Sequence, residues 1–233
     1  MNKITWAIQT NLINDIALNK LWYAVQEAGA SVQELVVIPF SYEFDNDVPE
    51  MDGIVIPYGS TKLTKMAAKR GWKGLCFDEE TFRADTWLKN HPHMLNSDSK
   101  MMKVKDLFLH FEGFDENEEW FIRPLRDLKE FNGTVTTVKE IKKWMSSVYS
   151  GNFSFNEDTD VVIAPVQTLY NECRFFVVDG KIVDGSIYRQ NGRLRSMKID
   201  DISIIEKAQA LADIWLPHPV CVMDLALTDD GFK

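Results

Sequence analysis

The chain has 233 residues, of which 45% are hydrophobic and 12% aromatic, with a net charge of −9 and a pI near 5.0. This composition supplies a real core and excludes a disordered chain. The acidic balance argues against a protein that coats nucleic acid or binds an anionic membrane, and it leaves room for a local basic pocket that binds phosphates.

The N-terminus has no secretory signal pattern, and no run of apolar residues is long enough to cross a membrane. We therefore expect a soluble, cytoplasmic protein. Its three cysteines, Cys76, Cys173 and Cys221, are far apart, and each lies in or beside an apolar run. This pattern predicts buried thiols in a reducing compartment, not a disulfide framework or a metal site.

The first part of the chain resembles a βαβ unit in its hydrophobic pattern. Strands are predicted at residues 4–9, 35–40, 53–57 and 75–77, and helices at 15–28, 62–69 and 79–90. The turn at 59–62 (GSTK) could cradle an anion, but it lacks P-loop spacing, so a helix cap is the favoured interpretation. His91 and His93 lack partners at metal-ligand spacing and are interpreted as structural or surface residues.

The middle of the chain combines helical and strand patterns with basic residues. Helices are predicted at 101–111 and 138–149. Between them, a strand that begins at Trp120 ends in Arg123 and a proline, and Lys129 follows six residues later. Gly133 lies beyond this lysine.

Residues 160–189 form a β-rich segment with a hairpin signal at Asp179-Gly180. Within it, Glu172 and Arg174 are two residues apart and therefore project from the same face of one strand. Such a pair predicts either a cross-strand salt bridge or a polar site on the sheet. Spacing alone leaves both interpretations open.

The C-terminal part is predicted to form a helix at 202–215 and a strand at 220–227, preceded by a basic tract with Arg195. The strand at 220–227 carries Asp224 among apolar residues. Burying an aspartate costs free energy unless it is paired or bound to a cation. Its partner could be a basic neighbour such as Arg174 or Arg195. Alternatively, Asp224 could be a ligand of Mg²⁺.

In chain order, the motifs are FIRP with K-x-F-x-G, then E-x-R before a D-G hairpin, then an aspartate in a strand. This series resembles the ATP-grasp superfamily, specifically a phage and bacterial clade named for two arginines and one lysine. The resemblance implies a mixed α+β and α/β fold class. A small α/β domain precedes the two α+β lobes of an ATP-grasp fold in the sequence. The resemblance assigns that domain to residues 1–95, the first lobe to 96–162 and the second lobe to 163–233.

The same resemblance implies roles for particular residues. For ATP, the implied residues are Arg123 and Lys129 at the phosphates and Ala164, Pro165 and Val166 in the inter-lobe hinge at the adenine edge. The implied catalytic residues are Glu172 and Arg174 at the cleft floor and Arg189 facing the substrate carboxylate or its phosphorylated form. Asp224 is the implied Mg²⁺ ligand.

The implied activity is ATP-dependent ligation of a carboxylate to an amine through an acylphosphate, which makes an amide or peptide-like bond. The implied partners are small-molecule or peptide carboxylate and amine substrates, with ATP and Mg²⁺ as cofactors and no nucleic acid or membrane. The oligomeric state stays open, because the aromatic residues could cover the surface of a homodimer.

The sequence departs from the family pattern at its end. The pattern continues with a strand carrying Glu-x-Asn, and the sequence ends at Lys233, where that strand would begin. An alternative function is therefore a catalytically inactive ATP-grasp-like module that binds nucleotide or protein. A third interpretation is a structural α/β protein whose charges are all salt bridges.

Overall fold

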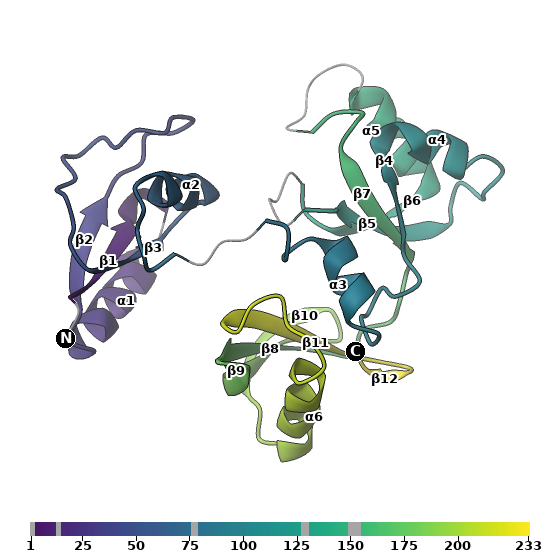
Figure 1. The fold of residues 1–233 in the computed structure, drawn as a ribbon. Helices are drawn as coiled ribbons and strands as arrows, with labels where there is room; N and C mark the ends of the chain where they lie inside the picture. Colours follow the sequence, from purple (N-terminus) through teal and green to yellow (C-terminus); the bar gives the residue numbers. More distant parts are fainter. Residues whose placement is uncertain (1–2, 13–14, 76–78, 127–130, 149–154) are drawn as a thin grey trace. The chain divides into compact units, whose positions relative to one another are not determined.

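A computed structural model describes residues 3–12, 15–75, 79–126, 131–148 and 155–233. The chain divides into two compact units, Met1–Phe77 and Asp78–Lys233 (Figure 1). Within the described ranges, no helix has the length and apolar character needed to cross a membrane.

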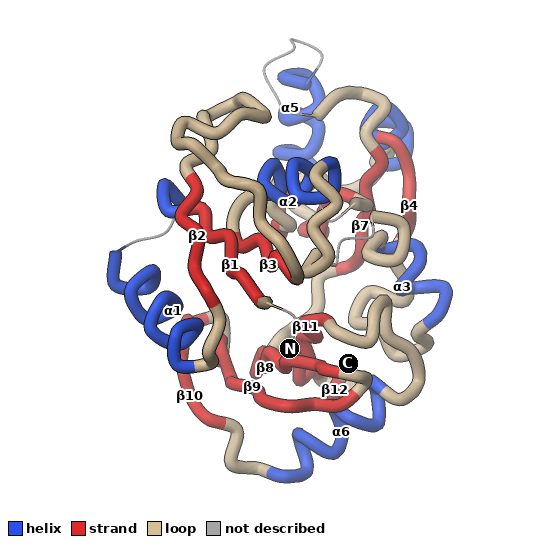
Figure 2. Tube along the Cα trace, turned by 60° about the vertical axis from the view of Figure 1, so that its left-hand side comes forward, coloured by secondary structure: helices blue, strands red, loops and turns tan. Residues whose placement is uncertain are grey.

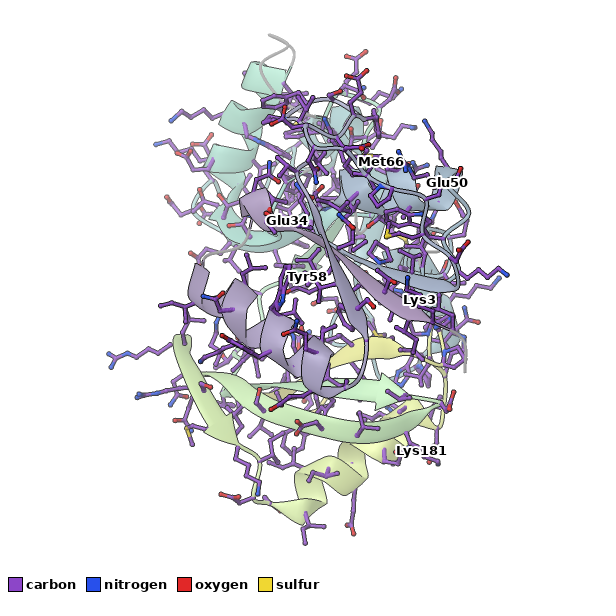
Figure 3. The ribbon with its side chains drawn as sticks, turned by 90° about the vertical axis from the view of Figure 1, so that its left-hand side faces the viewer. Lys3, Glu34, Glu50, Tyr58, Met66 and Lys181 are labelled. Atoms are coloured by element: carbon purple, nitrogen blue, oxygen red, sulfur yellow. The ribbon has the colours of Figure 1, made fainter. Side chains whose placement is uncertain are left out.

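The first unit is built on a parallel three-stranded sheet in the order β2-β1-β3. Its elements are β1 (Ile4–Gln9), the short 3-10 helix η1 (Thr10–Leu12), α1 (Asp15–Glu27), β2 (Ser31–Leu35), β3 (Ile54–Tyr58) and α2 (Thr61–Lys69). In Figure 3, Lys3 lies just before β1, whereas Glu34 and Tyr58 mark the carboxyl ends of β2 and β3. Buried apolar side chains from all three strands and from α2 make the core of this unit.

The strand predicted at 35–40 is wrong in its bounds. β2 ends at Leu35, which lies in register with Gln9 of β1. Val37 beyond it is buried, but it makes only an isolated bridge to Phe44. The apolar run therefore reflects burial of a turning segment, and the strand itself begins earlier, at Ser31. The strand predicted at 75–77 falls largely outside the described residues.

The second unit begins with α3 and an antiparallel four-stranded sheet in the order β4-β7-β5-β6. The elements are α3 (Ala84–Asn90), β4 (Lys100–Lys103), η2 (Val104–Asp106), α4 (Leu107–His110), β5 (Glu119–Pro124), β6 (Thr134–Thr137), α5 (Val138–Val148) and β7 (Asp160–Pro165). α4 and α5 cover one face of this sheet over a core that includes Phe111, Trp120, Ile122 and Ile141 (Figure 1).

Two helix predictions in this region need correction. The helix predicted at 101–111 is a strand, β4, followed by the short helices η2 and α4. β4 pairs with β7, with Lys100 opposite Ile163, because an open sheet edge satisfies its backbone groups better than an isolated short helix would. The helix predicted at 79–90 begins only at Ala84, whose N–H donates to Leu125 O at 3.0 Å.

The rest of the second unit is an antiparallel five-stranded sheet in the order β10-β9-β8-β11-β12. Its elements are β8 (Asn171–Val178), β9 (Lys181–Gln190), β10 (Arg193–Lys198), α6 (Ile202–Ala212), β11 (Cys221–Thr228) and β12 (Gly231–Phe232). Figure 2 shows α6 running along one side of this sheet. Its Ile204, Ala208 and Leu211 pack on Cys173, Phe175 and Leu225 of the sheet.

Two tight turns join β8 to β9 and β9 to β10. The hairpin predicted at Asp179-Gly180 is confirmed, with φ of 49° and 72° at its two central residues. Asn191 and Gly192 repeat this geometry with φ of 46° and 74°. Positive φ at both positions is the type I′ turn, whose twist matches that of the paired strands. The basic tract after Gly192 is consequently the edge strand β10.

Candidate active site

The five-stranded sheet has a covered face and an open face. Along β8, Cys173, Phe175 and Val177 are buried on the side of α6. Glu172 and Arg174 alternate with them and project from the opposite face, which we call the outer face. The prediction that these two charged side chains share one face is therefore confirmed.

Asp224 lies on β11 directly opposite Arg174. The guanidinium donates to both carboxylate oxygens, from Nε to Oδ1 and from Nη2 to Oδ2, each at 2.8 Å. This two-point contact raises the pKa of Arg174, chiefly through the hydrogen bonds to Asp224. Of the two salt-bridge partners considered for Asp224, the structure selects Arg174 over Arg195.

Glu172 is held by two side chains of β9. The Tyr188 hydroxyl donates to its Oε2 at 2.8 Å, and Nη1 of Arg189 lies 3.4 Å from its Oε1. A β-bulge makes both contacts possible, because Glu172 pairs with Arg189 while the next residue, Cys173, pairs with Ile187. Tyr188 is the extra residue in this bulge, and it turns toward the outer face.

Tyr188 also connects the two ion pairs. Its ring lies beneath the Arg174 guanidinium, 4.9 Å from centroid to Cζ. Burial, followed by the hydrogen bond to Glu172, raises the pKa of the Tyr188 phenol above its ordinary value. Glu172, Arg174, Tyr188, Arg189 and Asp224 thus form one connected array on the outer face.

Arg123 belongs to the other sheet. It lies on β5 beside Val162 of β7, with its guanidinium 5.1 Å from the centroid of the Trp87 ring on α3. Its Nε donates to Pro124 O at 3.2 Å. The stacked ring restricts the rotamers of a long cationic side chain. Lys129 lies outside the described residues.

The predicted hinge residues lie at the end of β7 and just beyond it. Ala164 is fully buried, Pro165 is the last residue of β7, and Val166 is 42% exposed. The next residue, Gln167, donates from Nε2 to Leu95 O at 2.6 Å, which fastens the start of this connection. The roles predicted for these residues at adenine stay predictions.

A cavity of about 270 Å³ lies between β6 and α5, lined by Ile122, Phe131, Thr136, Glu140 and Trp144 among others. Ile122 precedes Arg123 on β5, so its side chain points to the other face of the sheet. The cavity is therefore separate from the predicted phosphate-binding arginine.

Few side chains near Asp224 could serve as ligands of a metal ion. The described residues contain no group of three or more His, Cys, Asp or Glu side chains that could hold one. Mg²⁺ commonly takes one or two carboxylates together with phosphate oxygens and water. Asp224 fits that requirement, but both of its oxygens are engaged by Arg174.

In the first unit, Ser60 is the N-cap of α2 and accepts from Leu63 N, as the favoured interpretation predicted. Gln9 is only 3% exposed, and its Oε1 accepts from the Ser60 backbone and hydroxyl. In the second unit, His91 is buried with Nε2 3.1 Å from Leu211 O, which confirms a structural role.

Comparison with known proteins identifies the family. Residues 99–233, more than half of the chain, match the family model for an ATP-grasp domain, family 2 of the clade named for two arginines and one lysine. The chain belongs to this ATP-grasp family. The resemblance inferred from the motifs is therefore confirmed. No curated protein matches the sequence.

Solved structures share the ATP-grasp fold at low sequence identity. The RimK domain protein from Sphaerobacter thermophilus has a TM-score of 0.64 at 10% identity, over 98% of this chain and 88% of that one. D-alanyl-alanine synthetase A from Vibrio cholerae has 0.61 at 14%, over 99% and 86%. The ATP-grasp ligase PsnB, solved with a minimal precursor, has 0.56 at 10%, over 100% and 89%. These likenesses confirm the predicted fold class.

Sequence reasoning missed two residues of this ATP-grasp chain. Tyr188 follows an apolar position in a predicted strand, and strict alternation gives no sign of the bulge that turns it outward. Trp87 lies far from Arg123 in sequence, so their contact depends on how α3 packs against Leu125 and Val162. No local pattern predicts either contact.

Proposed function

We propose that the chain is an ATP-dependent carboxylate–amine ligase acting on a small-molecule or peptide carboxylate. The supporting observation is the polar array on the outer face, where Glu172, Arg174, Arg189 and Asp224 converge on one sheet of an ATP-grasp chain. Two proteins of similar structure, a D-alanyl-alanine synthetase and an ATP-grasp ligase complexed with a minimal precursor, support the same class of substrate.

In this proposal the four-stranded and five-stranded sheets belong to the two lobes, at about residues 96–162 and 163–233, and a domain at 1–95 precedes them in the sequence. Arg123 and Lys129 bind the nucleotide phosphates, since an arginine fork matches phosphate oxygens. The backbone at Ala164, Pro165 and Val166 binds the adenine edge. The assignments of Lys129 and Val166 rest on the family motifs alone, and those of Arg123, Ala164 and Pro165 rest also on their positions in β5 and β7.

The chemistry has two steps. A substrate carboxylate oxygen attacks the γ-phosphorus of ATP, the bond to the β-phosphate oxygen breaks, and ADP leaves. The amine then attacks the acyl carbon, inorganic phosphate leaves, and the nitrogen gives up a proton. Arg123 and Lys129 would offset the charge on the transferred phosphoryl group, and Arg189 would orient the carboxylate.

Asp224 would hold Mg²⁺ together with the phosphate oxygens, and the ion would supply further positive charge there. Glu172 keeps Arg189 and Tyr188 in place through its two contacts. No side-chain nucleophile is required, because both attacking atoms belong to the substrates.

Nucleotide binding is tested by thermal unfolding with and without Mg²⁺–ATP. At about 100 times Kd, one site adds roughly 2.7 kcal/mol to the free energy of unfolding. The shift should shrink in Asp224→Asn and persist in Glu206→Gln, which changes an exposed acid on α6. No shift in the wild-type chain would refute the proposal.

Turnover is tested by ADP release with pools of amino acids and short peptides. A ligase releases ADP only when both a carboxylate and an amine are present, and its product has the summed mass of both substrates minus one water. ADP release with water as the sole acceptor would instead indicate an ATPase.

An inactive nucleotide-binding module is the second candidate, favoured by the contact of Arg174 with both oxygens of Asp224. Its signature is a thermal shift with Mg²⁺–ATP and no ADP release with any pool. Arg174→Met would then bind Mg²⁺ more tightly without gaining turnover.

A further inference from the structure

The outer face carries a third cation in line with Asp224 and Arg174. Lys198 of β10 pairs directly with Ser186 of β9, which pairs with Arg174, which pairs with Asp224. Directly opposite residues of antiparallel strands present their side chains on the same face. A single row of side chains therefore crosses four strands and ends at Lys198.

The residues beside Lys198 support this orientation. Ile199 is buried in the core beneath the sheet, and Met197 pairs with the buried Ile187, so both point toward α6. The residue between them must point the other way. Strands lie about 4.8 Å apart, so Lys198 and Asp224 are about 14 Å apart along the row.

Lys198 differs from the other cations of this face in having no partner. Arg174 is paired with Asp224 and Arg189 with Glu172, whereas the Lys198 side chain is exposed and has neither a hydrogen bond nor an ion pair within the described parts of the chain. Among the three cations Arg174, Arg189 and Lys198, Lys198 is thus the one without an ion pair in the described parts of the chain.

We propose that Lys198, assisted by the Ser186 hydroxyl, binds the anionic group of the substrate, a carboxylate or phosphoryl oxyanion. This proposal rests on the proposed ligase function and adds a specificity residue to it. An ammonium group and a hydroxyl are both donors to such oxygens, and an exposed, unpaired lysine can turn toward a ligand without breaking an internal pair. Because Lys198 lies about 14 Å from Asp224 along the row, we place the anion that it binds apart from the Mg²⁺ ligand.

A second role would also account for an edge lysine. Charged side chains on edge strands oppose the pairing of sheets between molecules, and β10 is an edge strand with all six residues exposed. That role predicts that removing the charge promotes aggregation and leaves anion binding unchanged. The two roles therefore give different results in one titration.

The experiment is calorimetric titration of the full chain with inorganic phosphate and, separately, with succinate. Each titration is made without nucleotide and again with saturating Mg²⁺ and a non-hydrolysable ATP analogue. The variants are Lys198→Gln, Lys198→Arg and Lys207→Gln. Lys207 is the matched control, an exposed lysine on α6 at the covered side of the same sheet.

We expect Lys198→Gln to weaken binding of both probes at least about tenfold, which corresponds to about 1.4 kcal/mol. Lys198→Arg should restore binding, and Lys207→Gln should match the wild type. Binding should survive the ATP analogue, and Lys198→Gln should leave the affinity for Mg²⁺–ATP unchanged within about twofold.

Three results would overturn the proposal. In the first, Lys198→Gln binds phosphate and succinate as tightly as the wild type does. In the second, the ATP analogue abolishes binding of these probes to the wild type. In the third, Lys198→Gln loses affinity for Mg²⁺–ATP as well as for the probes. A chain that binds phosphate through Lys198 but never binds Mg²⁺–ATP would sink the ligase function alone, so the two failures are distinguishable.

Discussion

The pair of Arg174 and Asp224 allows its contribution to stability to be separated from its contribution to the site. Both contacts are 2.8 Å, which is ideal for a bidentate pair, but the two side chains are 46% and 44% exposed. Solvent screening limits such pairs to about 0.2–1 kcal/mol. We place the coupling free energy near the upper end, at about 1 kcal/mol, because two hydrogen bonds act together.

A double-mutant cycle measures this value directly. Urea unfolding of the wild type, Arg174→Met, Asp224→Asn and the double variant gives the coupling free energy, and the same cycle in high salt should give less. A coupling above about 3 kcal/mol would refute the reasoning, because only a desolvated pair reaches that size.

The contribution of Asp224 to binding of Mg²⁺–ATP is measured with the same variants. Asp224→Asn should cost about 1 kcal/mol in the absence of ligand, yet remove most of the roughly 2.7 kcal/mol that Mg²⁺–ATP adds at about 100 times Kd. If Asp224→Asn lowered the free energy of unfolding equally with and without Mg²⁺–ATP, Asp224 would have only a structural role.

Three further predictions concern the same unit. A Cβ added at Gly185 would lie 2.6 Å from Cδ1 of the fully buried Phe175, so Gly185→Ala should lower the free energy of unfolding by about 1–3 kcal/mol in urea. The hydrogen bond from Arg83 lowers the pKa of Asp85, so the pair stabilises the fold above about pH 3.9 and loses its effect as pH falls through the lowered pKa. Asp85→Asn should cost about 0.5–1 kcal/mol at pH 7 and progressively less below about pH 4, again by urea unfolding. Burial raises the pKa of Cys173, so iodoacetamide at about pH 8 should label it only as fast as the chain unfolds, by mass spectrometry of its peptide.

The alternation of side chains between the two faces of a strand predicted much of the five-stranded sheet. The shared face of Glu172 and Arg174 follows from the two-residue period, and the hairpin follows from Asp179-Gly180, since both depend on local geometry alone. The motif series also predicted the family, because it records which residue types recur in order along the chain.

What alternation could not predict is which strands pair and in what register. The strand at Lys100–Lys103 has a helical pattern and becomes a strand only because β7 offers it an open edge. The partner of Asp224 depended on the order β9-β8-β11, which puts Arg174 opposite it and keeps Arg195 on a strand that does not pair with β11. Pairing is a property of the whole sheet, so local pattern left these questions open.

The structure also shows why the two interpretations of Asp224 need not exclude each other. An ion pair worth about 1 kcal/mol is easily exchanged for a ligand contact that contributes more. Arg174 satisfies both oxygens of Asp224, and the Tyr188 ring lies against its guanidinium. Binding of Mg²⁺ at Asp224 would release Arg174 toward the phosphate oxygens, where its bidentate geometry applies equally well. Half-exposed pairs would therefore suit the proposed site, where the charges are held in place and then exchange partners when the nucleotide binds.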